Sequence, residues 1–222
     1  MTYYDDDYAA DSYAESQWEA QLIEDGVREL SQDRIREYLA KYGDAVEARI
    51  GKCTEDAHEL SPDHPAIAVI LACTAGELII RYLILRPLVQ GALLSDKWAE
   101  MLANKILGQR TASDRELLPA ILRAEGIEIN NITLADGRPI WPLFNGTIVP
   151  LRNEIVHRGA SANAEQAHDA IECAEHMLSS IVEPMALRFG LSWPESGVWH
   201  QIEQGVGGAT FSSRYQPEDP FI

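Results

Sequence analysis

Basic residues and cysteines are scarce in this chain of 222 residues. There are 18 lysines and arginines against 35 aspartates and glutamates, which gives a formal net charge of −17. A protein that binds nucleic acids without selectivity needs a basic face for the phosphate backbone, and anionic membranes attract the same positive charge. The deficit of basic residues therefore excludes a general nucleic-acid binder, and no membrane partner is expected.

The three cysteines, Cys53, Cys73 and Cys173, are odd in number and far apart in the sequence. Metal and redox sites need cysteines or histidines at short, regular spacings, so we expect neither a metal nor another cofactor. Cys73 and Cys173 stand among apolar residues and are predicted to be small core residues. The N-terminus lacks the basic start and apolar run of a signal peptide, and unpaired cysteines are typical of the cytoplasm. We therefore expect a cytoplasmic protein.

The acidity lies in the flanks of the chain. Residues 1–60 carry a net charge of −10 and residues 161–222 carry −7, whereas residues 61–160 are neutral, with ten acidic and ten basic side chains. The exclusion of nucleic acid thus applies to the flanks and not to the centre. The net charge of the chain is therefore no argument against a nucleic-acid site in the central segment.

Apolar residues recur at steps of three and four along most of the chain, which predicts amphipathic helices. Two stripes precede residue 60, the first formed by Leu22, Ile23, Val27 and Leu30 and the second by Ile35, Leu39, Tyr42, Val46 and Ile50. Further helices are predicted at about 65–92, 95–108, 113–125 and 163–189. No segment alternates long enough to predict a sheet. The predicted fold class is therefore all-α, an antiparallel helical bundle over residues 17–190.

The two ends of the chain show no such pattern. Residues 1–16 are rich in aspartate and tyrosine and are predicted to be a mobile acidic arm. Such an arm is most simply a solubilising tail, and the alternatives are that it shields a basic site or binds a basic partner. Residues 191–222 are predicted to be an irregular tail rich in glycine, proline and aromatic residues.

The longest apolar run, residues 65–89, contains Glu77 and Arg81 near its middle. Each charge would cost about 2.5–3.5 kcal/mol at the centre of a bilayer, so we predict a buried core helix, with a kink at Pro87. Glu77 and Arg81 are four residues apart with the acid first, which is the favourable order for a helical ion pair. We expect them to pair with each other.

The most informative segment of the chain is Leu151–Gly159. Its apolar residues Leu151, Ile155 and Val156 are expected to anchor a helix to the core, and Gly159 is the residue type that ends helices. Its polar face is formed by Arg152, Asn153, His157 and Arg158. A basic helix end is favourable for the helix dipole, so these residues also have an explanation without any function.

Spacing within this segment predicts a homodimer. Asn153 and His157 are four residues apart and share a helix face, whereas Arg152 and His157 are five residues apart, or about 140° around the helix axis. One straight helix would therefore not direct the arginine and the histidine at a single point. Two copies that face each other across a two-fold axis would bring both pairs together in a composite site.

The order Arg152-Asn153-x-x-x-His157 within an apolar helix, followed by Arg158-Gly159, resembles the motif of HEPN domains. These are small α-helical bundles, many of them metal-independent ribonucleases of toxin–antitoxin, CRISPR-linked and phage-defence systems. The resemblance implies an endoribonuclease with RNA as its substrate, and an antitoxin or other regulatory protein as a partner. Family members often carry a polar or acidic residue near the motif on the preceding long helix, a role that Glu77 or Arg81 would fill here.

The resemblance also implies roles for individual residues. A ribose 2′-hydroxyl attacks the adjacent phosphate with His157 as general base or acid, and the guanidinium of Arg152 stabilises the charged transition state. Asn153 orients His157 or holds a phosphate oxygen. No metal is needed because the nucleophile belongs to the substrate, and DNA should resist cleavage because it lacks that hydroxyl. Further contacts to RNA are assigned to Arg158, Arg138, Glu77 and Arg81.

Other interpretations stay open from the sequence alone. The same motif is compatible with a HEPN-like module without catalysis that serves as a dimerisation or partner-binding scaffold. Two histidines and a glutamate share one helix face at metal-ligand spacing, namely His168, Glu172 and His176. They lie off the apolar stripe, which favours a solvated face. The tail carries three large aromatics that are expected to pack against the bundle or a partner rather than to stack on bases, namely Trp193, Trp199 and Phe211.

Overall fold

The computed structural model of the chain describes residues 5–92, 96–108, 112–192 and 200–201. Helices make up most of these residues, which confirms the predicted all-α class. The α-helices are α1 (Asp5–Leu60), α2 (Pro65–Leu78), α3 (Arg86–Gly91), α4 (Asp96–Gly108), α5 (Ala112–Ala124), α6 (Ile140–Leu143), α7 (Val149–Arg158), α8 (Ala164–Met177) and α9 (Glu183–Arg188). A short 3-10 helix, η2, covers Ile129–Asn131.

The only strands in the described part of the chain are two residues long. β1 (Leu191–Ser192) pairs antiparallel with β2 (His200–Gln201), and Leu191 lies opposite Gln201. The tail aromatics Trp193, Trp199 and Phe211 lie outside the described residues.

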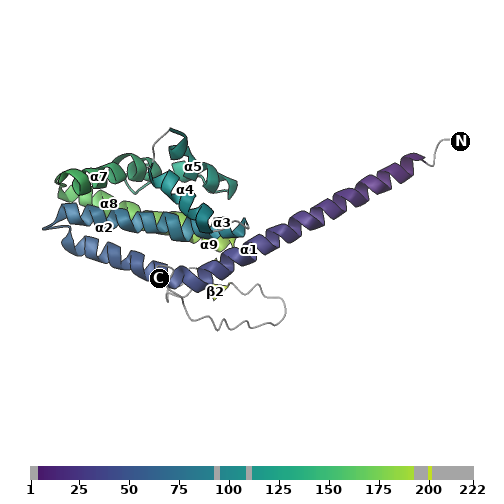
Figure 1. Ribbon diagram of the computed structural model, residues 1–222, viewed down its shortest axis with the longest axis horizontal. Coiled ribbons are helices and arrows are strands. Elements are labelled where there is room, and N and C mark those ends of the chain that lie inside the picture. The colour runs from purple at the N-terminus through teal and green to yellow at the C-terminus, as the bar shows by residue number, and fades with distance from the viewer. Residues whose placement is uncertain (1–4, 93–95, 109–111, 193–199, 202–222) are drawn as a thin grey trace.

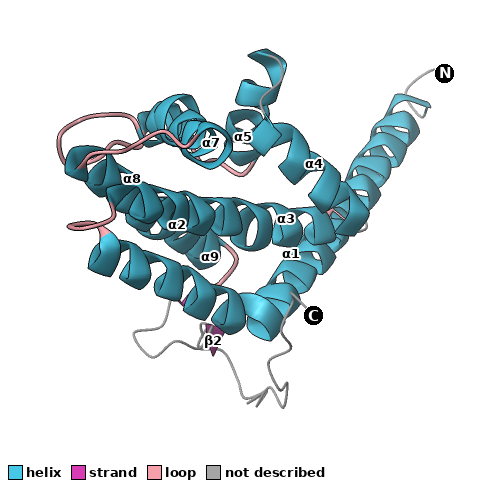
Figure 2. Ribbon diagram, turned by 60° about the vertical axis from the view of Figure 1, so that its left-hand side comes forward, coloured by secondary structure: helices cyan, strands magenta, loops and turns pink. Residues whose placement is uncertain are grey.

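The core of the bundle is formed by helices that lie side by side. α2 lies between the C-terminal half of α1 and α8, and α3 and α9 continue α2 and α8 along the same directions (Figure 1). α7 contacts α2, and α4 contacts α3, so both cover the side of the core helix that faces away from α1 (Figure 2). The N-terminal half of α1 leaves the bundle and projects away from it (Figure 1).

The predicted irregular arm at residues 1–16 is wrong for the part that the structure describes, because α1 is helical from Asp5 onward. Residues 5–25 contain neither glycine nor proline, and alanine, glutamate and glutamine among them are good helix formers. Acidic residues at the start of a helix also interact favourably with its dipole. The absence of an apolar stripe does not exclude a helix here, because a solvated helix needs no stripe.

Within the described residues, three π-helical segments interrupt the bundle helices, and each ends two residues before a proline. η1 (Ile79–Leu85) precedes Pro87, η3 (Phe144–Ile148) precedes Pro150, and η4 (Leu178–Val182) precedes Pro184. In a regular α-helix the proline ring collides with the carbonyl four residues earlier. A wider turn relieves that collision. The helix that was expected to kink at Pro87 therefore continues from Pro65 to Gly91, with the irregularity placed in η1.

The helical stretch Pro65–Gly91 is long and apolar enough to cross a membrane, with an 18-residue window of mean hydropathy 2.0. Inside the bundle, 56% of that window is buried. Val69, Ala72 and Cys73 of α2 have no exposed surface. The hydropathy of this stretch is thus accounted for by its place as the core helix of the bundle.

Gly76 marks the closest approach of α2 to the segment that leads into α7. A β-carbon at this position would lie 2.4 Å from the ring of Phe144, which is buried and stacks on Trp141 with ring centroids 6.3 Å apart. Because glycine has no side chain, the ring of Phe144 packs directly against the α2 backbone. This contact holds η3 (Phe144–Ile148), the segment directly before α7, against α2 beside Glu77.

We expect Gly76→Ala to destabilise the protein by about 1–3 kcal/mol, the usual cost of overpacking a core, although alanine favours a helix by about 1 kcal/mol. The matched control is Gly51→Ala, because Gly51 is exposed in α1 with no atom within 4 Å of the added β-carbon. The control should stabilise by up to about 1 kcal/mol. Urea unfolding followed by circular dichroism measures both free energies. Equal effects of the two substitutions would contradict the contact with Phe144.

Candidate functional site

Helix α7 carries the motif and is fixed at both ends. Pro150 stands in its first turn, where a missing N–H breaks no intrahelical bond. Gly159 ends the helix with φ of 65° and ψ of 30°, and its N–H donates to the carbonyl of Ile155 at 3.0 Å. This left-handed conformation favours glycine, so the predicted stop at Gly159 is confirmed.

One side of α7 is buried and the other faces solvent. Val149 and Ile155 are buried, and Leu151 packs partly buried against the core. Val156 was expected to be a third anchor, but half of it is exposed (50%), so that prediction is wrong. It follows directly after Ile155 and is turned about 100° from it, toward the exposed Asn153.

The Arg152 side chain lies against α2 and contacts three groups. Its Nη2 atom forms an ion pair with Oε1 of Glu77, and its Nη1 atom donates to Oδ1 of the neighbouring Asn153 at 3.1 Å. The guanidinium also hydrogen-bonds the thiol of Cys73. Only 24% of the Arg152 side chain and 20% of the Glu77 side chain are exposed. Water and salt therefore screen this pair less than they screen a surface pair.

Cys73 is part of the contact with the motif, which sequence reasoning missed. Cys73 and Glu77 are four residues apart on α2 and therefore share the face beneath Arg152. Burial raises the pKa of the Cys73 thiol, and the hydrogen bond from Arg152 opposes that rise. The four-residue spacing from Glu77 is the signal that would have indicated the contact.

A second buried thiol lies close to the first one, on α8. Burial raises the pKa of Cys173 to about 12, and its interaction with Cys73 adds to the rise. The Cys173 thiol hydrogen-bonds the carbonyl of Ile140 at 3.7 Å. Both thiols are therefore protonated and unreactive at neutral pH, and their predicted burial in the core is confirmed.

The predicted ion pair between Glu77 and Arg81 is wrong. Arg81 turns toward α4, where its Nη1 donates to Oε1 of Glu100 at 2.8 Å and its Nη2 donates to Oδ1 of Asn104 at 3.0 Å. Glu77 pairs with Arg152 instead. Ion pairs within one helix stabilise by only about 0.3–0.5 kcal/mol, so partners offered by neighbouring helices override them.

His157 lies one residue before the end of α7 and is exposed. Within the described ranges, no side chain forms a hydrogen bond or an ion pair with its ring. His157 and Arg152 are five residues apart, or about 140° around the helix axis. The imidazole of His157 therefore faces solvent, while the guanidinium of Arg152 packs against α2. The two residues of the motif thus face different ways in one chain.

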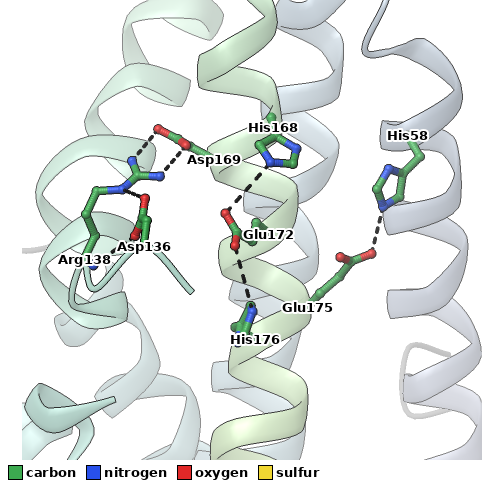
Figure 3. A network of polar contacts seen from close by, with 8 residues as sticks. All are labelled: His58, Asp136, Arg138, His168, Asp169, Glu172, Glu175 and His176. Carbon is green, nitrogen blue, oxygen red and sulfur yellow. Dashed lines mark hydrogen bonds and ion pairs between the residues drawn. The ribbon is translucent and has the colours of Figure 1, made fainter. Parts of the chain in front are cut away.

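The other two candidate arginines have carboxylate partners. Arg158 forms an exposed ion pair with Glu154, one turn earlier, at 3.0 Å. Arg138 donates through Nη1 and Nη2 to the two carboxylate oxygens of Asp169 on α8, at 2.7 Å each, and through Nε to Asp136 at 2.5 Å (Figure 3). Its fork ties the turn before α6 to α8, so an RNA phosphate would have to displace two carboxylates from it.

The hydrogen bonds of Arg138 shift the pKa values of the groups that form them. The hydrogen bonds from the Arg138 side chain lower the pKa of Asp169. The backbone N–H of Arg138 is the main cause that lowers the pKa of Asp136. The pKa of Arg138 is raised in turn, chiefly by Asp169. All three groups are therefore charged at neutral pH, and the bridge is intact there.

The polar face of α8 carries the residues that have metal-ligand spacing. Glu172 lies between His168 and His176, with 4.0 Å from a carboxylate oxygen to Nε2 of each imidazole (Figure 3). Glu175 turns to α1, where its Oε1 lies 2.8 Å from Nε2 of His58. In the parts of the chain that the structure covers, no three or more such side chains are arranged to hold a metal ion.

A cavity of about 320 Å³ lies between α1 and α8, away from the motif. Its walls include three carboxylates, those of Asp44, Glu47 and Glu175. Burial, followed by the nearby charge of Asp44, raises the pKa of Glu47. These carboxylates would repel the phosphates of RNA.

The structure brings Arg152, Asn153 and Glu77 together and places His157 and Arg158 at the end of the same helix. Arg81 and Arg138 have other partners. No family model, curated protein or solved structure matches the chain. The function has to be inferred from the chemistry of these residues.

We expect Glu77→Gln to destabilise the protein by about 1–3 kcal/mol, because it leaves the half-buried guanidinium of Arg152 without its counter-ion. A double-mutant cycle with Arg152→Gln should give a coupling energy of about 1 kcal/mol or more. The matched control is the exposed pair of Arg158 and Glu154, whose cycle should give no more than about 0.5 kcal/mol. Equal coupling energies in the two cycles would contradict a stronger interaction at Glu77.

The lowered pKa of Asp169 predicts a loss of stability in acid. A carboxyl group whose pKa is lower in the folded state contributes stability above its unfolded pKa of about 3.9, and that stability is lost as the pH falls through the folded value. We therefore expect Asp169→Asn to lower the free energy of unfolding at pH 7 and to flatten its decrease below about pH 4. Urea titrations across this range measure the slope.

The Arg138→Gln background is the control for this pH dependence. Without the guanidinium the cause of the lowered pKa is gone, so Asp169→Asn should then change the slope little. A slope that is the same in the wild type and the Asp169→Asn protein would show that the bridge does not contribute to acid stability.

Proposed function

We propose that the chain is a metal-independent endoribonuclease of the HEPN type that works as a homodimer in the cytoplasm, in a stress, defence or toxin–antitoxin setting. The observation that carries the proposal is the contact of Arg152 in the motif with Glu77 on the preceding long helix. HEPN domains often have an acidic or polar residue at that place. The all-helical chain and the exposed His157 support the same assignment.

The reaction needs a base, an acid and a cation. A ribose 2′-hydroxyl gives its proton to one imidazole and attacks the adjacent phosphorus, and the bond from phosphorus to the 5′-oxygen breaks. A protonated imidazole gives its proton to the leaving 5′-oxygen, so the products are a 2′,3′-cyclic phosphate and a 5′-hydroxyl. His157 of each of two copies would supply one of these groups, since an exposed ring can reach the RNA backbone.

Arg152 would stabilise the extra negative charge on the phosphorus oxygens, because its planar fork matches two oxygens at once. Glu77 and Asn153 hold that fork in one orientation, which reduces the entropy lost when a phosphate binds. Glu77 also offsets the positive charge. Affinity for RNA would therefore be weak and salt-sensitive, with selectivity from the shape of the cleft.

The geometry of α7 supports a composite site. The side chain of Arg152 packs against α2 while His157 faces solvent, so a substrate phosphate beside one side chain is out of line with the other. A second copy related by a two-fold axis would supply the missing partner. An antitoxin or other regulatory protein would then act by covering the cleft or by separating the copies.

A second candidate function is a HEPN-like scaffold without catalysis, for dimerisation or partner binding. The observation that favours it is the half-buried pairing of Arg152 with a carboxylate. An arginine whose charge is satisfied within the fold already has a structural role. Such a protein would dimerise and leave RNA intact.

Cleavage of RNA in EDTA by the wild type, His157→Ala and Arg152→Ala tests the proposal. We expect the wild type to cleave RNA and not DNA, and each variant to be slower by about 10²–10⁴-fold, the usual contribution of an acid–base or charge-stabilising group. The matched controls are His168→Ala and Arg123→Ala, which remove an exposed histidine and an exposed arginine away from α7. Mass spectrometry of the fragments should find the cyclic phosphate.

Three results would overturn the ribonuclease proposal. Cleavage that survives both substitutions would place the chemistry elsewhere, and cleavage that is lost with chelator would require a metal. A wild type that dimerises but leaves RNA intact would favour the scaffold. Analytical ultracentrifugation of the same samples separates that case from a chain that does not dimerise at all.

A further inference from the structure

The core helix α2 keeps one apolar side open to solvent. Ile67 near its start is 46% exposed, and Ile70, three residues later on the same side, is only partly buried. The most apolar 18-residue window of the stretch Pro65–Gly91 is 56% buried. The bundle thus covers little more than half of its most apolar segment. Exposed apolar surface of this kind is typical of a protein interface.

Val156 of α7 lies beside this open side of α2. It follows Arg152 by one helical turn and therefore points to the same flank of α7, where Arg152 pairs with Glu77 of α2. Because α7 ends at the end of the bundle where α2 begins (Figure 1), the turn after Arg152 leads toward the start of α2. Val156 is 50% exposed. Ile67, Ile70 and Val156 define what we call the α2–α7 face.

The charges that border this face cancel one another. Glu77 lies two turns after Ile70 on α2 and pairs with Arg152, and Arg81, one turn further on, pairs with Glu100 of α4. The signs alternate along the row formed by these four residues. A two-fold axis sets such a row against its own reverse, so that each charge meets one of opposite sign. The row is therefore complementary to a copy of itself.

Charge also decides between the possible occupants of the face. A lipid surface would have to take up charged groups, which are costly in a bilayer, and anionic lipids repel a chain of net charge −17. RNA would need basic groups that no carboxylate already holds. Two copies of so acidic a chain repel each other over most of their surface. They can meet only where the local charge is small, as it is here.

We infer that the α2–α7 face is the surface through which two copies of the chain join. The apolar side chains Ile67, Ile70 and Val156 would form the centre of the contact, with the ion pairs around them, as is usual in protein interfaces. The inference rests on the proposed function, because the composite site needs a second α7 beside the first one. The contact would bring the α7 helices of both copies to one place.

Sedimentation velocity of the full-length chain over a concentration series tests this face. We expect the wild type to dimerise, and Ile67→Lys and Val156→Lys each to raise the dissociation constant of the dimer by about tenfold or more, because an unpaired ammonium group would be buried in the contact. Each substitution changes the formal net charge from −17 to −16. A weaker dimer would therefore not result from greater overall repulsion.

The matched control is Leu187→Lys on α9. Leu187 is 50% exposed, like Val156, and the substitution makes the same change of charge. We expect this variant to dimerise like the wild type. Because all three positions are half exposed, circular dichroism should show the same helix content in every variant. Mixing Ile67→Lys with Ile67→Glu chains should restore dimers, since the two faces then carry opposite charges.

The outcomes separate this inference from the ribonuclease proposal. A monomeric wild type, or equal weakening by all three lysine substitutions, would overturn the α2–α7 face. A monomer that floats with phosphatidylcholine vesicles would assign the face to a lipid surface instead. Face variants that remain dimeric and still cleave RNA would overturn the face alone. A wild-type dimer that the face variants dissociate, but that leaves RNA intact, would support the face and overturn the ribonuclease.

Discussion

The ion pair between Glu77 of α2 and Arg152 of α7 joins the core helix of the bundle to the helix that ends in His157. A half-buried pair stabilises only where its geometry is held, because both charges lose hydration. Here Cys73 and Asn153 complete the contacts of the guanidinium. With Arg152 held against α2, the helix spacing places the imidazole of His157 on the solvent side of α7. Everything proposed for the motif follows from that orientation.

The approach of α7 to α2 depends in turn on backbone features and not on charge. Gly76 leaves room for the ring of Phe144, and the π-turn η3 before Pro150 lets the same helix continue into α7 without a break. Proline would otherwise kink or end the helix there. A glycine and a proline thus bring the guanidinium within reach of the only acidic residue of α2.

The sequence was sufficient where local physics decides and insufficient where helices compete for partners. Apolar periodicity predicted the all-α class, and the positive φ that glycine allows explains why the stop at Gly159 was predictable. The partner of Glu77 was not predictable, because Arg81 and Arg152 are equally good cations and only the packing of α7 favours the second. Val156 was misplaced because hydrophobicity alone does not say which side of a short helix is covered.

The candidate site residues also differ in how far the sequence alone predicts their position and their partners. Asn153 and His157 share the solvent side of α7 as their spacing indicated, since a helix fixes which residues share a face. The role of Arg138 depends on Asp169, which is 31 residues away in the sequence and adjacent only in the folded chain. The helicity of the acidic arm was missed because the absence of an apolar stripe argues against burial and not against a helix.

Charged groups are distributed unevenly over the molecule. The arginines of α7 are each matched by a carboxylate, Arg152 by Glu77 and Arg158 by Glu154, so a single chain presents little attraction to RNA. The acidic half of α1 projects from the other end of the molecule (Figure 1), and salt limits its field to about 10 Å. Its charge would therefore not alter the field at the motif. A chain of net charge −17 can therefore hold a narrow phosphate site, provided that its acidic helix is placed far from that site.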